Sequence, residues 1–290
     1  MVNKLATVLT LLLLIASAHA IDMTDLWEPG DPAASEVRML VELETAQGDD
    51  ALIIRTQIAR TYMFRNDFGQ AREILRDVES DVAMAGPEAQ ARYWLELGRS
   101  YASHRHPPGS QTNETRAFAH DAYQMALAIT RDAGLDGLTV DVLHMFAFVD
   151  IDPAQQLSWT RKALEAVLES DQPAAQHWEP SIRSNLGEAH FDLAQYAQAL
   201  EQFQRALALR EHDGAPPAMV RDANWHVART LRMLGQLDRA LKIQQSLADE
   251  AYAANAQRHY IHDELSLLYA ALDDPERARH FAEHSAALKQ

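Results

Sequence analysis

The chain lacks cysteine altogether and holds little glycine or lysine. Its 290 residues include no cysteine, 11 glycines and 4 lysines. Without thiols there can be no disulfide scaffold, no thiolate-ligated zinc site and no cysteine nucleophile. Lys and Arg together number 26 against 42 Asp and Glu, which gives a net charge of −16. This balance argues against a nucleic-acid partner, because phosphates call for a basic face, and against a polybasic membrane-binding patch.

Alanine is by contrast abundant. There are 49 alanines in the chain, and alanine has the highest helix propensity of all residues. The composition therefore favours an all-α fold. A chain of this length can form one or two domains with a substantial core, and we expect one because no Gly/Ser-rich linker interrupts it.

The first twenty residues have the features of a secretory signal peptide. Lys4 precedes an apolar run from Leu5 to Ile15, and Ala18-His19-Ala20 offers a small-x-small cleavage pattern. The run is too short to span a bilayer comfortably, so an uncleaved N-terminal anchor is the less favoured alternative. We predict that residues 1–20 are removed and that the mature chain is not inserted in a membrane.

The expected location is a bacterial periplasm. Export without any cysteine suits that compartment, where a large core makes disulfides unnecessary. A lipoprotein is excluded, because no cysteine follows the apolar run to carry the lipid. Removal of residues 1–20 would take away Lys4 and no acid, and so would leave the mature chain at −17.

The middle of the chain contains a repeated pattern. Trp94, Leu97, Gly98 and Tyr101 follow a W-x2-L-G-x2-Y spacing, and further along Ala119, Tyr123 and Ala126 share their spacing with Ala199, Phe203 and Ala206. This pattern resembles the tetratricopeptide repeat (TPR), a helix–turn–helix unit. The resemblance implies that small residues let the two helices of a unit approach closely, while large residues fill the space around that contact.

Six such units can be placed between Ile53 and the C-terminus. The small position on their first helices is held in turn by Ala59, Gly98, His144, Gly187, Ala228 and Ser266. The third unit, 140–170, is irregular, because His144 stands in the small position and Gln156 replaces an expected alanine. Its segment 138–149 could by itself form a strand, but the repeat register predicts a helix. An insertion at 104–112 contains Pro107-Pro108-Gly109, which cannot continue a helix.

The resemblance therefore implies an all-α, right-handed superhelical solenoid of about six TPR-like repeats. We expect an extended N-terminal segment at 21–34 and a single solenoid domain at 35–290. An extra helix from about Ser35 to Ala46 brings the expected number of helices to thirteen. Asp152-Pro153 and Asp274-Pro275 each predict a helix start, with an N-cap carboxylate before a proline.

No catalytic centre can be assigned. His280 and His284 fit an H-x-x-E-H zinc pattern with Glu283, and His259 and His262 could extend such a site. However, only six residues follow His284, which leaves no third ligand beyond it, and the repeat register places both histidines on an outer face. His104 and His106 in the insertion have no nearby carboxylate. We predict no catalytic residue, metal or cofactor, and keep a metal-dependent enzyme using the C-terminal histidines as a remote alternative.

What remains is a binding surface. TPR-like solenoids hold peptides or proteins on a concave face lined by the first helix of each unit. Helical spacing assigns 24 positions to this face, which carry five arginines and four acids. Its near-neutral charge, with aromatic side chains beside arginines, suits the carboxylates of a partner. The partner-binding residues we predict are Arg60, Met63, Arg92, Arg99, Phe148, Glu188, Phe191, Trp225, Arg229 and Arg232.

The favoured function is thus a non-catalytic adaptor or scaffold that binds a protein or peptide through this groove. We expect a monomer or a weak oligomer. A structural subunit of an envelope assembly, which would bind through outer or terminal surfaces, is the alternative.

Overall fold

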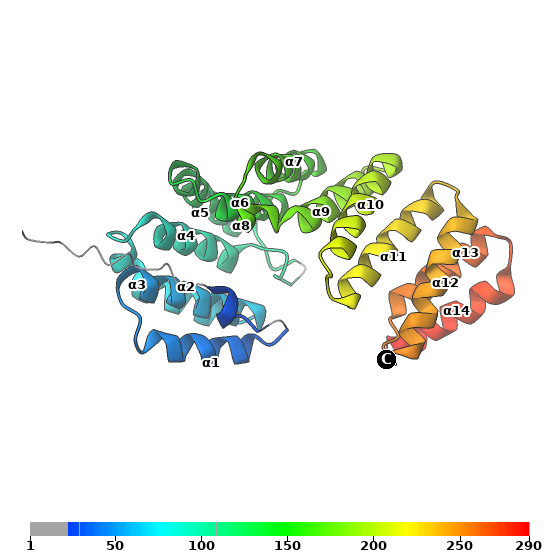
Figure 1. Ribbon diagram of the computed structural model, residues 1–290, viewed down its shortest axis with the longest axis horizontal. Helices are drawn as coiled ribbons and strands as arrows, with labels where there is room; N and C mark the ends of the chain where they lie inside the picture. Colours follow the sequence, from blue (N-terminus) through cyan, green and yellow to red (C-terminus); the bar gives the residue numbers. More distant parts are fainter. Residues whose placement is uncertain (1–22, 29, 108, 290) are drawn as a thin grey trace, which may run out of the picture.

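The computed structural model describes residues 23–28, 30–107 and 109–289, so the predicted signal peptide at 1–20 lies outside the described residues. The described part contains one 3-10 helix, fourteen α-helices and no strand (Figure 1). The elements are η1 (Met23–Leu26), α1 (Pro32–Leu43), α2 (Gly48–Phe64), α3 (Phe68–Val82), α4 (Pro87–Tyr101), α5 (Asn113–Asp132), α6 (Asp136–Val149), α7 (Pro153–Glu169), α8 (Pro173–Gln176), α9 (Glu179–Asp192), α10 (Tyr196–His212), α11 (Pro217–Met233), α12 (Leu237–Ala253), α13 (His259–Ala271) and α14 (Pro275–Leu288).

The helices form a row of six hairpins. In each hairpin, two helices that follow one another pack together, and the pairs are α2–α3, α4–α5, α6–α7, α9–α10, α11–α12 and α13–α14. Successive hairpins stack side by side from the blue to the red end of the chain (Figure 1). Thirteen of the described helices have 12 residues or more, as predicted, and the four-residue α8 lies in the connection between α7 and α9.

The N-terminal segment differs from the expectation. The extended stretch predicted at 21–34 contains η1, and α1 begins at Pro32 rather than near Ser35. Asp31 explains the earlier start, because its carboxylate accepts hydrogen bonds from the backbone amides of Ala33 and Ala34 ahead of Pro32. Ser35 is consequently buried inside the first turns of α1, where its hydroxyl donates to the Asp31 carbonyl.

The other helix starts follow the predicted capping chemistry. The Asp152 carboxylate accepts from the amide of Gln155, and the Asp274 carboxylate accepts from the amide of Arg277. In both helices proline stands at the first position, where a missing N–H costs nothing. The insertion also behaves as expected, since α4 ends at Tyr101 and α5 begins only at Asn113.

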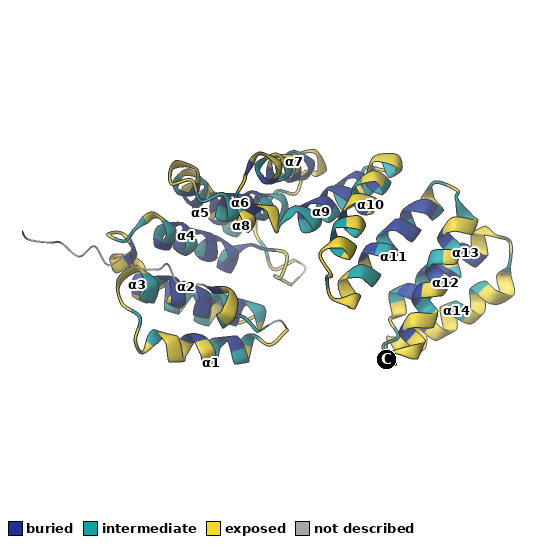
Figure 2. Ribbon diagram, in the orientation of Figure 1, coloured by how far each residue is buried: buried dark blue, intermediate teal, exposed yellow. Residues whose placement is uncertain are grey.

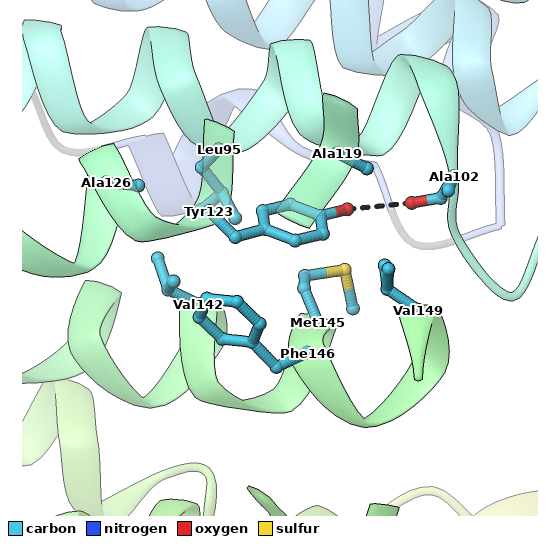
Figure 3. Close-up of a cluster of buried hydrophobic side chains, with 9 residues drawn as sticks. All are labelled: Leu95, Ala102, Ala119, Tyr123, Ala126, Val142, Met145, Phe146 and Val149. Carbon is cyan, nitrogen blue, oxygen red and sulfur yellow. Dashed lines mark hydrogen bonds between the residues drawn. The ribbon is translucent and has the colours of Figure 1, made fainter. Parts of the chain in front are cut away.

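Close helix contact at a glycine holds two of the hairpins together. A Cβ atom built on Gly98 would come within 2.5 Å of the Tyr123 ring, and one on Gly187 would come equally close to the Phe203 ring. Both rings are fully buried. Figure 3 shows Tyr123 in its cluster, above Phe146, with its hydroxyl donating to the Ala102 carbonyl at 2.8 Å. The predicted role of the small position is thus confirmed at both glycines.

The third hairpin is packed through other side chains, with Val140 and Leu143 of α6 in one cluster with Ala163 and Val167 of α7. The helical register that puts Tyr123 and Phe203 on the second helices puts Thr160 there in α7. His144, which stands in the small position, is not part of this cluster. His144 is half-buried, and its Nε2 lies 2.6 Å from the side-chain amide of Asn185. The segment with strand-like composition is therefore helical, as the repeat register predicts.

The core is a series of six clusters of buried side chains along the row of hairpins. Figure 2 shows buried surface on the facing sides of the hairpins and exposed surface on the outer sides. The largest fully buried side chains include Tyr123, Phe146, Phe203, Leu143 and Leu231, which belong to four of the six hairpins. Because each hairpin buries its apolar side against its neighbours, stability is distributed along the solenoid.

Replacing Gly187 by alanine should destabilise the protein. Alanine normally stabilises a helix over glycine by about 1 kcal/mol, but here its methyl group would overlap Phe203. We expect a net loss of about 2 kcal/mol in the free energy of unfolding, as in overpacked cores. Gly69→Ala is the matched control, because its Cβ would meet nothing closer than 3.7 Å. Urea denaturation of both variants tests this, and equal effects would contradict it.

Candidate partner-binding face

The inner face of the solenoid is formed by the first helices of the hairpins. Neighbouring first helices contact each other at α2–α4, α4–α6 and α11–α13, whereas the second helices pack mainly against first helices. All ten predicted partner-binding residues lie on first helices. Eight are half-buried and so reach the surface, but Met63 is 3% exposed and Arg99 is 7% exposed. These two were predicted to line the surface, and the close packing of α2, α4 and α6 instead makes them part of its floor.

A buried charge network joins α4 to α6 at the N-terminal half of this face. The guanidinium of Arg99 donates to the Glu96 carboxylate one turn earlier and to the Asp141 carboxylate on α6. A second cation, Arg60 on α2, lies 3.7 Å from the same Glu96. Glu96 and Asp141 are both nearly fully buried. Two acids are therefore shared by two arginines in the interior of the solenoid.

The network changes the titration of its members. Burial alone would raise the pKa of the Asp141 carboxyl, but the charges of Arg99 and Arg60 outweigh it and hold that pKa below its usual value. The pKa of the Arg60 guanidinium is lowered, first by burial and then by the charge of Arg99. Burial also lowers the pKa of His144 to about 4, so this imidazole is neutral at pH 7. Asp141 is thus ionised and serves as the anionic link between α4 and α6.

A second group of predicted residues assembles on α9 and α11. The Arg229 guanidinium stacks on the Phe191 ring, 3.7 Å from its centroid, and lies 5.1 Å from the Trp225 ring. The same guanidinium donates to the Glu188 carboxylate at 3.1 Å. Burial would raise the pKa of Glu188, but contacts from His226 and Arg229 lower it. Four residues chosen from the repeat register thus form one aromatic and charged surface.

This surface extends onto α13. The indole of Trp225 packs edge-on against Tyr260 and donates its N–H to the Tyr260 carbonyl at 3.2 Å. Arg232 binds the carboxylate of Glu264 through two hydrogen bonds, at 2.5 and 3.2 Å. The aromatic cluster Phe191–Trp225–Tyr260 is therefore fixed in place, with its rings half-exposed.

The remaining two predicted residues also contact other side chains of the protein. Arg92 donates to Glu88 one turn earlier on α4, and Phe148 packs against the rings of His104 and His144. Every arginine in the predicted set consequently has an acid partner within the chain. The repeat register did not reveal Glu96 and Glu264, because both stand one residue away from the spacing assigned to the inner face.

The C-terminal histidines are not grouped with enough other donors to form a metal site in the described part of the chain. In the described ranges, no group of three or more histidine, aspartate or glutamate side chains could hold a metal ion. His280 and His284 are exposed on α14, as expected, and with His262 they line a largely apolar pocket of about 660 Å³. Among the described helices, none is both long and apolar enough to cross a bilayer.

The repeat itself matches a known family. Residues 180–213, which comprise α9 and α10, match the model of the tetratricopeptide repeat. The other five hairpins have the same arrangement, with Gly98 and Gly187 in equivalent contacts. The chain thus contains a tetratricopeptide repeat within a solenoid of TPR-like hairpins. A comparison with curated proteins by sequence finds no match.

Solved structures share most of the solenoid. BtubC from P. vanneervenii has a TM-score of 0.61 and 17% identity, over 78% of this chain and 91% of that one. PilW, a type IV pilus biogenesis factor, has a TM-score of 0.58 and 20% identity over 81% and 92% of the two chains. NprR in complex with its cognate peptide NprX has a TM-score of 0.52 and 13% identity over 87% and 71%. At these identities the likeness shows the TPR solenoid fold, as predicted.

Because Asp141 links α4 to α6 as a carboxylate, we expect its contribution to the stability of the protein to be lost at acidic pH. Asp141→Asn should lower the free energy of unfolding at pH 7 by about 3 kcal/mol, because it leaves Arg99 with one acid partner fewer. The folded-state pKa of Asp141 is depressed, so its stabilising effect exists above the unfolded pKa and is lost as pH falls through the folded value.

The difference between wild type and Asp141→Asn should therefore shrink below about pH 4. Urea denaturation across pH 3–7 measures it. Asp121→Asn serves as the control, because Asp121 is exposed on α5. A difference between wild type and Asp141→Asn that stays constant with pH would contradict this assignment.

Proposed function

We propose that this protein is a non-catalytic adaptor or scaffold that binds a peptide or a partner protein on its inner face. The observation that carries the proposal is the set of half-exposed rings Phe191 and Trp225 beside the guanidinium of Arg229, continued by Tyr260 against Trp225. Half-exposed aromatic rings beside a guanidinium are the side chains that dominate binding energy at protein interfaces. Internal contacts hold them in place, which reduces the entropy lost on binding.

The comparisons support this proposal at the level of fold. NprR, which shares the solenoid, is seen in complex with its cognate peptide. A solenoid presents a long concave surface, which suits an extended chain better than a compact small molecule. In the described part, ion pairs between arginines and acids hold the polar side chains of the inner face in place. We therefore propose binding rather than catalysis.

Peptide selection on the purified protein tests the binding face. Peptides selected from a random library should bind the wild type, and Trp225→Ala should weaken them by about 30-fold, or about 2 kcal/mol, because a central aromatic side chain is lost. Tyr252→Ala is the matched control, since Tyr252 is 76% exposed on α12, away from the inner face. Fluorescence anisotropy with labelled peptides measures both. Equal losses in the two variants, or none in Trp225→Ala, would count against the proposed face.

We further propose that the protein acts in the periplasm after removal of residues 1–20. The support is the sequence of the signal segment, with Ala18 and Ala20 at the cleavage positions. The protein made in a Gram-negative host should be recovered in the periplasmic fraction with Ile21 as its N-terminus. Ala20→Arg should block processing, while Ala20→Ser should leave it intact. N-terminal sequencing that finds the segment retained in the wild type would refute cleavage.

A further inference from the structure

The first α-helix of the solenoid has an apolar stripe on its outer side. In α1, Val37 is 62% exposed, Leu40 is 47% exposed and Val41 is 63% exposed, and Ala33 is exposed in line with them. Their spacing of four, three and one residues puts all four side chains on one side of the helix. Met39, on the opposite side, is fully buried. The helix therefore has two apolar sides, of which only one faces the core.

The stripe lies at the N-terminal end of the row of hairpins. α1 packs mainly against α2 and η1, and Figure 2 shows exposed surface along its outer side. The end of a solenoid usually has a polar outer surface, because no further hairpin covers it. A line of exposed aliphatic side chains in that place is instead typical of a surface that associates with another molecule.

The N-terminus is too short to cover the stripe once residues 1–20 have been removed, as proposed above. Only Ile21 and Asp22 then precede η1, and two extended residues span about 7 Å. From Ala33 to Val41 the helix rises about 12 Å. Ile21 and Asp22 therefore cannot cover the stripe, whereas a helix of another molecule can.

The charged residues beside the stripe favour a second copy of the chain as that molecule. Arg38 and Glu42 are both exposed, and they stand two residues before and two residues after Leu40. Helical geometry places both on the same flank of the stripe. Among the described residues, Glu42 has no ion-pair partner, and Arg38 pairs with Glu28 alone.

This arrangement is complementary to itself. When two copies of α1 pack antiparallel about a two-fold axis at Leu40, the charged flank of one copy meets the charged flank of the other. Arg38 of each copy then lies opposite Glu42 of the other copy, as charged residues do beside the apolar seam of paired helices. Two apolar stripes and two pairs of opposite charges are thus matched by one symmetry axis.

We propose that two copies of this chain dimerise through antiparallel packing of their α1 helices. Val37, Leu40 and Val41 of each copy form the contact, and Leu40 meets its counterpart on the two-fold axis. A contact of this size is smaller than a standard protein interface, so we expect a Kd on the order of 100 μM. The proposal is independent of the proposed function, because α1 holds none of the predicted partner-binding residues.

Sedimentation equilibrium of the purified protein tests for the dimer. The average mass should rise from monomer towards dimer between about 5 and 500 μM. Leu40→Glu should raise the Kd about tenfold or more, because it puts two carboxylates together on the two-fold axis. Leu168→Glu is the matched control and should leave the Kd unchanged, since Leu168 is 58% exposed on α7, outside the proposed contact.

Two results would overturn the dimer. One is a protein that stays monomeric over the whole concentration range, which would assign the stripe to a different protein. The other is a dimer that Leu40→Glu does not weaken more than Leu168→Glu does, which would place the contact on another face. Circular dichroism of both variants checks that they keep their helical content.

A pair of charge reversals tests the antiparallel register. Arg38→Glu and Glu42→Arg should each weaken self-association about tenfold, because each sets like charges opposite each other twice in the dimer. An equal mixture of the two variants should recover the wild-type affinity as a heterodimer, since both contacts then join opposite charges. Sedimentation of the mixture, with one variant carrying a fluorescent label, measures this. A mixture that associates no better than the separate variants overturns the packing about Leu40.

Discussion

The close approach of two helices at a small residue is the constraint on which the rest of this structure depends. Gly98 and Gly187 bring their helices against the rings of Tyr123 and Phe203, with no room for a Cβ atom. When the two helices of a hairpin are held this tightly, the apolar side of each hairpin becomes a surface that the next hairpin can cover. The stack of hairpins then leaves the first helices on the inner face. The distances between the first helices on that face thus depend on the buried contacts between the two helices of each hairpin.

Tight stacking also explains why the charges of the inner face are arranged as they are. Where α2, α4 and α6 pack closely, positions that register assigns to the surface become buried, and charged residues there must find partners. Arg99 therefore lies between Glu96 and Asp141. At α9, α11 and α13 the first helices carry larger aromatic residues, and Arg229 stacks on rings while paired with a single acid. The N-terminal part of the face thus contains a buried charge network, and the C-terminal part a half-exposed aromatic surface.

The features that could be predicted from the sequence are those that depend on residues close together in the chain. The glycine positions, the proline-initiated helices and the break at 104–112 each follow from the chemistry of a few neighbouring residues. The helical state of 138–149 required the repeat as well, since its β-branched residues alone allow a strand. The pairing of Arg99 with Asp141, and of Arg229 with Glu188, could not be predicted, because it depends on the distance between helices about 40 residues apart. Glu96 and Asp141 are separated by 45 positions and meet only through Arg99.

The same argument explains why the insertion was the least predictable feature. Its proline and glycine residues predict only that the helix ends. They do not predict which part of the protein the loop packs against. In the structure, stacking of His106 on Phe68 turns it towards the inner face, and Arg105 and His104 follow. A chain with a net charge of −16 and only 26 basic residues thereby places three arginines around one cavity. Burial lowers the pKa of the neighbouring His104, and the crowding of positive charge from Arg105 and Arg99 lowers it further.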